Sequence, residues 1–200
     1  NYGQIFVSMA QLLKEEKRLL LRALTGAFAF ASVSILYSTI ALLLTSAHHL
    51  PDLFIGLVPL VGIFGALSTR YIGKYADQGY TRLLTWMGCG LFLVSWICFY
   101  FGQILLSAYV IGFALIQLAL ALVHTSNQSI IFRLRPDAKS RINAIYMTTY
   151  FIGGAAGSAL GIFAWNRGGW TMTCLAGVGL VVFCILFSMI DAFLQKKQMA

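Results

Sequence analysis

Charged side chains are scarce in this chain. Its 200 residues include 14 Lys and Arg and only 6 Asp and Glu, whereas 60% of the residues are hydrophobic and the mean hydropathy is +0.83. A water-soluble domain of this length could not bury so much apolar surface in a single core. The composition therefore excludes an ordinary soluble domain and predicts that lipid surrounds most of the molecule.

Two further features are missing. No stretch alternates polar and apolar residues as the strand of a membrane barrel would, so helices are expected. The four cysteines lie inside apolar runs without Cys-x-x-Cys spacing, which predicts small buried or lipid-facing side chains and neither a metal site nor a disulfide. These cysteines are Cys89, Cys98, Cys174 and Cys184. The sequence thus predicts an all-α membrane protein.

Six apolar stretches are long enough to cross a bilayer, whose hydrocarbon core of about 30 Å takes about 20 helical residues. The predicted spans are 20–44, 53–75, 83–101, 104–133, 141–165 and 169–193. Together they form a predicted six-helix transmembrane domain over residues 20–195. Residues 1–19 are more polar and are expected to be a cytoplasmic linker whose end is an interfacial helix. Because the chain starts without Met, we expect it to be the later part of a longer protein.

The basic residues occupy alternate gaps between these spans. Thirteen of the fourteen Lys and Arg residues lie at or near the start of the first span, the end of the sixth, or the second and fourth gaps with the span ends beside them, and Arg167 is the exception. The positive-inside rule then places these gaps and both termini in the cytoplasm. The net charge of +8 is therefore interpreted as a sign of topology, and no nucleic-acid partner is expected.

Composition also distinguishes the helices. The second and fifth spans carry small residues on one face, which lets helices approach closely in lipid. The predicted helix-interface glycines are Gly62, Gly65, Gly153, Gly157 and Gly161. The third and sixth spans are bulky and apolar on all sides, with Phe92 and Trp96 on the third, so they are expected to face lipid.

Polar side chains at membrane depth gather on the first and fourth spans. Gln117 and His124 share one face of the fourth span, and because polar groups cannot face lipid, these two helices are predicted to line a cavity. The candidate cavity residues are Ser34, Tyr37, Phe113, Gln117, His124, Tyr146 and Tyr150. Gln117 is the preferred solute contact. For His124, proton coupling and a structural hydrogen bond both stay open, and for the aromatic residues so does ordinary helix packing.

These features resemble the carboxy-terminal half of a major facilitator superfamily transporter. The loop from Gly73 through Asp77 to Arg82 is similar to a signature of that family, although Gly79 comes one place early and a single basic residue follows it. The segments 135–147 and 153–158 resemble bacterial efflux members. The resemblance implies half of a twelve-helix fold, built from two inverted three-helix repeats, with the second and fifth helices at the contact with the other half.

The resemblance also implies a function. It suggests alternating-access secondary transport of a small organic solute, driven by proton exchange in the efflux direction, in a bacterial inner membrane. The partners would be the lipid bilayer, the amino-terminal six-helix half and the solute, and the proton gradient would replace any cofactor. No charged residue lies near the middle of a predicted span, so a proton-carrying carboxylate is expected in the other half.

A conformational role is predicted for the cytoplasmic loop. Asp77 is expected to pair with Arg133 or Arg135 in one conformation only, and the alternative is an exposed carboxylate of little energetic weight. The residues of this loop motif are Gly73, Asp77, Gly79, Arg82, Arg133 and Arg135.

The sequence also bears on two other classes of function. An enzyme is not expected, because His124 has neither an acid nor a second imidazole close by in sequence, and no catalytic or metal site is predicted. A self-contained oligomeric six-helix channel or scaffold would share the same topology and stays an alternative.

Overall fold

The computed structural model describes residues 2–199, and within this range the chain is helical and contains no strand. The predicted all-α class is therefore confirmed. The elements are α1 (Tyr2–Glu15), α2 (Lys17–His48), α3 (Asp52–Leu57), the 3₁₀ helix η1 (Val58–Gly62), α4 (Ile63–Tyr75), the π-helical turn η2 (Ala76–Tyr80), α5 (Thr81–Gly102), α6 (Leu106–Leu134), the 3₁₀ helix η3 (Pro136–Ala138) and α7 (Lys139–Met199).

Four helical segments of the described chain are long and apolar enough to cross a membrane. They are Lys17–His48, Asp52–Gly102, Leu106–Leu134 and Pro136–Lys197. The second and fourth segments contain 51 and 62 residues, which is more than twice the length of about 20 residues that one crossing of a bilayer needs.

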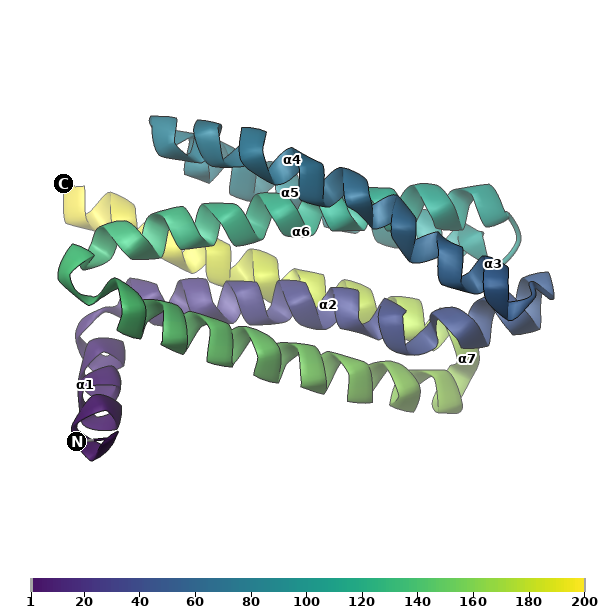
Figure 1. Ribbon diagram of the computed structural model, residues 1–200, viewed down its shortest axis with the longest axis horizontal. Coiled ribbons are helices and arrows are strands. Elements are labelled where there is room, and N and C mark those ends of the chain that lie inside the picture. Colours follow the sequence, from purple (N-terminus) through teal and green to yellow (C-terminus); the bar gives the residue numbers. More distant parts are fainter. Residues whose placement is uncertain (1, 200) are drawn as a thin grey trace.

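Glycines interrupt both of the longer segments. Gly79 has a φ of 97° and Gly169 a φ of 62°, a backbone region that glycine enters without strain. At Gly168 and Gly169 the chain turns back, so that α7 has a first arm, residues 139–167, and a second arm, residues 170–199 (Figure 1). Both breaks lie at or beside gaps predicted from the sequence.

Helix α2 lies against both arms of α7, while α5 packs on α6 (Figure 1). Small residues make these contacts close. A Cβ atom at Gly153 or Gly157 would overlap the backbone of Ala27 or Ala31, and one at Gly65 would lie 2.9 Å from the Gln117 backbone. The predicted interface glycines Gly153 and Gly157 of the first arm therefore contact α2. Gly62 and Gly65, at the end of η1 and the start of α4, contact α6 of the same chain. Gly161 approaches Ile35 and Ser38 in the same way.

The third predicted span is not simply lipid-facing. Phe92, Trp96 and Phe99 of α5 are fully buried, and the Trp96 indole donates a 2.8 Å hydrogen bond to Ser32 of α2. Only the opposite face of α5, which includes Leu93 and Ile97, is exposed. The expectation was wrong for the inner face because a helix that is apolar all round gives no sign of which side packs inward.

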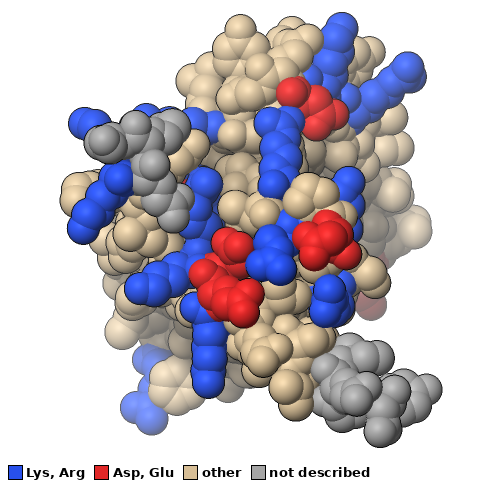
Figure 2. All heavy atoms as spheres, turned by 90° about the vertical axis from the view of Figure 1, so that its left-hand side faces the viewer, with Lys and Arg blue, Asp and Glu red and all other residues tan. Residues whose placement is uncertain are grey.

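One end of the bundle collects the charged residues. Figure 2 looks at this end, and Lys and Arg crowd it together with several acidic side chains. Ion pairs join its parts: Arg133 lies 3.7 Å from Asp77, and Arg135 lies 3.3 Å from Glu15 at the end of α1. We call this end, which also holds both chain ends (Figure 1), the basic end.

The glycine contacts predict the effect of adding side-chain volume. Gly157→Val should destabilise the protein by about 1–3 kcal/mol, because the new methyl groups would force α2 and the first arm of α7 apart. Gly90→Val is the matched control, since a Cβ there meets nothing within 4 Å. Thermal unfolding in detergent, followed by size-exclusion chromatography, measures both. Equal stability of the two variants would contradict the close contact.

Candidate functional site: a polar cavity and a buried ion pair

The predicted cavity residues of α2 and α6 meet at Tyr37 and Gln117. The Gln117 amide donates a 2.9 Å hydrogen bond to the Tyr37 hydroxyl, and the Tyr37 ring stands edge-on to Phe113 at 5.8 Å. Tyr37 is 46% exposed, whereas Phe113 is fully buried behind it. Tyr37 and Gln117 can therefore reach a solute, and Phe113 supports them by packing.

A cavity of about 190 Å³ opens beside Gln117, between the segment that contains η1 and α4, helix α6, and the first arm of α7. Its lining residues are Gly62, Gly65, Ala66, Thr69, Gln117, Leu120, Ala121, His124 and Tyr150. Gly62 makes room for the amide, since a Cβ there would lie 2.8 Å from Gln117 Nε2. None of these lining residues is acidic or basic, apart from the imidazole of His124. The cavity is thus suited to an uncharged, partly polar group.

Two tyrosines of the first arm surround His124. The Tyr146 hydroxyl lies 3.1 Å from His124 Nδ1, and the Tyr150 ring centre lies 4.9 Å from that of the imidazole. Tyr146 is fully buried, and Tyr150 stacks on Phe30 at 4.2 Å. The structure therefore places His124, Tyr146 and Tyr150 next to one another, with His124 and Tyr150 at the wall of the cavity.

Ser34 lies elsewhere. It is buried where α2 meets the first arm, and its backbone carbonyl accepts a 3.5 Å hydrogen bond from Ser158. It does not line the cavity described above. Its hydroxyl suggested a cavity role in the sequence, but its position on α2 turns it toward the close contact with α7.

A buried ion pair was missed in the sequence. Asp191 of the second arm is fully buried, and its carboxylate accepts hydrogen bonds of 2.6 and 2.9 Å from Arg22 and of 2.8 and 3.2 Å from Arg18. The sequence predicts Arg22 as part of the basic flank of the first span, yet its side chain is only 4% exposed. A signal was available, because Asp191 is the sole acidic residue of 139–200, and Arg18 and Arg22 share one helical face.

From this pair a row of hydrogen bonds runs to the cavity. Arg22 donates to the Asn127 side-chain oxygen at 3.3 Å, the Asn127 amide donates to the Tyr146 hydroxyl at 3.4 Å, and Tyr146 contacts His124. Asn127 and Tyr146 are fully buried. We call Asp191, Arg22, Asn127, Tyr146 and His124 the buried hydrogen-bond chain. Arg22 also donates to Thr85 of α5 at 3.3 Å.

Of the two arginines predicted to pair with Asp77, the structure places Arg133 beside it. Arg133 lies 3.7 Å from the Asp77 carboxylate and donates to the backbone carbonyls of Ala76 and Asp77 at 3.2 and 3.0 Å. Arg135 instead contacts Glu15, Glu16 and Asp137. Two carboxylates raise the pKa of the Arg135 guanidinium; that of Asp137 has the larger effect and that of Glu15 the next.

The loop glycines differ in backbone conformation. Gly79 supplies the positive φ of the turn, whereas Gly73 does not have a positive φ, and a Cβ at either position would meet nothing within 4 Å. Arg82 is exposed in the first turn of α5.

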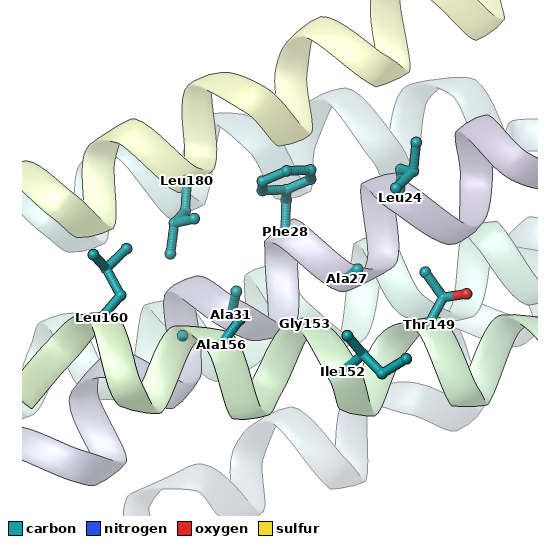
Figure 3. Close-up of a pocket in the computed structure, with 11 residues that line it drawn as sticks. Leu24, Ala27, Phe28, Ala31, Thr149, Ile152, Gly153, Ala156, Leu160 and Leu180 are labelled. Atoms are coloured by element: carbon teal, nitrogen blue, oxygen red, sulfur yellow. The ribbon is translucent and has the colours of Figure 1, made fainter.

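A second hollow, separate from the cavity, lies between α2 and the two arms of α7 (Figure 3). It measures about 220 Å³, and its walls include Leu24, Phe28, Ile152 and Leu180. Thr149 contributes the only side-chain hydroxyl of the lining. This apolar groove shares no residue with the polar cavity, so it offers hydrocarbon contact without hydrogen-bonding specificity.

Comparison with known proteins relates the chain to transporters. No family model matches the chain. It is 41% identical over 187 residues to the uncharacterized transporter YgaY of Escherichia coli O157:H7, covering 93% of this chain and 48% of that protein, and the same figures hold for YgaY of strain K12. The chain is homologous to bacterial transporters.

A weaker similarity names a superfamily. The chain is also 22% identical over 188 residues to the uncharacterized MFS-type transporter YybF of Bacillus subtilis, covering 94% of the chain and 45% of that protein. The predicted resemblance to transporters, and through this weaker similarity to the major facilitator superfamily, is thereby confirmed. The chain spans about half the length of the curated relatives it matches.

The buried ion pair of Asp191 should contribute more to stability than the exposed ion pair of Asp77. Asp191→Asn should destabilise the protein by about 3–5 kcal/mol, because it leaves buried arginines without their carboxylate. Asp77→Asn, the control at an exposed ion pair, should change stability little. Thermal unfolding of both variants in detergent makes the comparison, and a larger loss for Asp77→Asn would show that the buried pair is misassigned.

Proposed function

We propose that this chain is the carboxy-terminal, six-helix half of a major facilitator superfamily transporter, which carries a small organic solute by alternating access in exchange for protons, in the direction of efflux. The observation that carries the proposal is the 41% identity to a protein named as a transporter, of which the chain matches 48%. The similarity to an MFS-type transporter at 22% adds the superfamily.

Six membrane crossings are part of the proposal. The glycine breaks at Gly79 and at Gly168–Gly169 divide the two longest apolar segments, so that four candidate segments can supply six crossings. Six crossings in an inverted pair of three-helix repeats would bring both ends of the chain to one side. The shared position of the chain ends and the basic residues is consistent with this arrangement (Figures 1 and 2).

The solute site we propose is the polar cavity around Gln117. Gln117, His124 and Thr69 are the hydrogen-bonding side chains of its wall together with the Tyr150 hydroxyl, and Tyr37 lies beside it, bonded to Gln117. A pocket of this kind orients a small solute by a few polar groups and holds it by its apolar walls. Import in place of efflux would use the same residues, so the direction rests on the resemblance alone.

The partner we propose is the amino-terminal half of the same protein. Large apolar side chains are exposed along η1 and α4, including Leu60, Phe64 and Leu67, and on the first arm, including Phe151 and Ile152. Lipid or a second helical half can cover such a surface, whereas water cannot. The basic end would face the cytoplasm of a bacterial inner membrane under the positive-inside rule.

The Asp77–Arg133 contact fits a conformational latch. It joins the loop after α4 to the end of α6 at the basic end, and both side chains are largely exposed. In the proposal this contact forms when the basic end is closed and separates when it opens. A weak ion pair suits this role, since alternating access needs two states of similar free energy.

A side-specific labelling experiment tests the proposal. In the full-length protein without its native cysteines, Gln117→Cys should react with a membrane-impermeant maleimide in both right-side-out and inside-out vesicles. An imposed proton gradient should raise one rate and lower the other, because only one side of the cavity is open at a time. The control is Ile97→Cys on α5, which is 59% exposed in the structure and would face lipid.

The outcomes separate the alternatives. Labelling of Ile97→Cys should be about tenfold slower or more, since neither the charged reagent nor a thiolate is stable in hydrocarbon. Rates at Gln117→Cys that are equal from both sides and indifferent to the gradient would indicate an open channel. Absence of labelling from either side would remove Gln117 from a transport cavity.

A further inference from the structure

The buried hydrogen-bond chain has a fixed direction, which begins at Arg22. A guanidinium carries hydrogen-bond donors and no acceptor. Arg22 Nη1 lies 3.3 Å from Asn127 Oδ1, so the Asn127 oxygen must face the arginine and its amide nitrogen must face Tyr146. Reversing the Asn127 amide would oppose two donors in a buried site, which costs the loss of a hydrogen bond and its desolvation.

The same reasoning continues to His124. The Tyr146 hydroxyl already accepts a hydrogen bond from Asn127, and the other partner described for it is His124 Nδ1 at 3.1 Å. Because Tyr146 is fully buried and no third partner is described for its hydroxyl, the hydroxyl proton finds an acceptor only at Nδ1. In a neutral imidazole the ring proton then lies on Nε2.

We propose that Arg22 and Asp191 are positioning residues of the cavity: through Asn127 and Tyr146 they fix His124 as the neutral Nε2–H tautomer, so that the cavity offers its solute a hydrogen-bond donor at this position. The part concerning a solute rests on the proposed transport function. The part concerning the tautomer depends only on the buried hydrogen-bond chain.

Several contacts hold the Arg22 guanidinium, from which the buried hydrogen-bond chain takes its direction, in place. Asp191 binds Arg22 through two hydrogen bonds and Arg18 through bonds of 2.8 and 3.2 Å, and Thr85 accepts a further bond from Arg22. These groups come from α2, α5 and the second arm of α7, while Asn127 belongs to α6 and Tyr146 to the first arm. The orientation of the guanidinium is thus set by three elements before it reaches Asn127.

The surroundings of His124 add no competing charge. Tyr146 and Tyr150 of the first arm contact its ring, Gln117 precedes it on α6, and Thr69 of α4 shares the cavity wall. None of these groups is charged at neutral pH. Followed from His124, the buried hydrogen-bond chain reaches its first charged side chain at Arg22. No hydrogen bond from another described residue to Nε2 is observed, so this nitrogen is left for a solute.

Nitrogen NMR of the full-length protein in lipid nanodiscs tests the inference directly. With ¹⁵N-labelled histidine, and with His124 identified by loss of its signals in His124→Gln, the wild type should show a protonated Nε2 and an unprotonated Nδ1 near neutral pH. A protonated Nδ1 in the wild type would overturn the proposal whatever the variants do.

A single isosteric substitution should invert the tautomer. In Asn127→Asp the carboxylate can accept from both Arg22 and Tyr146, so the Tyr146 hydroxyl would turn toward it and accept a hydrogen bond from Nδ1–H of His124. The ratio of the two tautomers should change by about tenfold or more in favour of Nδ1–H, the effect expected for one buried donor without a partner. An unchanged ratio would contradict transmission along the chain.

Two controls separate transmission from a general effect of charge or folding. Thr85→Val removes another hydrogen bond of Arg22 that does not lead to His124, and it should leave the tautomer as in the wild type. Asn127→Asp combined with Tyr146→Phe removes the link, so the inversion should disappear, and its persistence would contradict the chain. Because the NMR result needs no solute, it can fail while the labelling of Gln117→Cys succeeds, and the reverse also holds.

Discussion

The long apolar helices of this chain suit the interior of a bilayer, where water is absent. A charge in that environment must be paired within the protein, and a backbone hydrogen bond must be made within a helix. The chain meets the first requirement with one buried carboxylate, Asp191, which two arginines of α2 share. This ion pair joins α2 to the last helical arm, residues more than 160 positions apart in sequence, and so fixes the basic end of the bundle.

The ion pair also connects that end to the cavity. Its arginine contacts Asn127 and the asparagine contacts Tyr146, which meets His124 beside Gln117. The three links measure 3.3, 3.4 and 3.1 Å, and the first two are buried. A buried polar network of this kind specifies one arrangement of helices when all its members have partners. The cavity therefore depends on residues that do not line it.

Much of the fold could be predicted from the sequence, because the bilayer sets helix lengths and the basic residues mark one end. The positions of Gln117 and His124 on one face of α6 followed from helical periodicity. The partners did not, because periodicity assigns a residue to a face but does not name the helix that the face meets. For this reason the sequence alone predicts Arg22 as a flanking charge, Ser34 as a cavity residue and the Trp96 face of α5 as lipid-facing. Arg133 and Arg135 were equally close to Asp77 in sequence, and only the structure separates them.

The central claim is that the chain crosses the membrane so that all its basic gaps lie on one side. Single cysteines at positions 49 and 139, in the full-length protein without native cysteines, test it most directly with an impermeant thiol reagent on intact cells. His49 lies at the end of α2 and Lys139 at the start of α7, at opposite ends of the bundle. The account predicts labelling at 49 on intact cells and at 139 only after the membrane is opened. Labelling of both positions from the same side would contradict it.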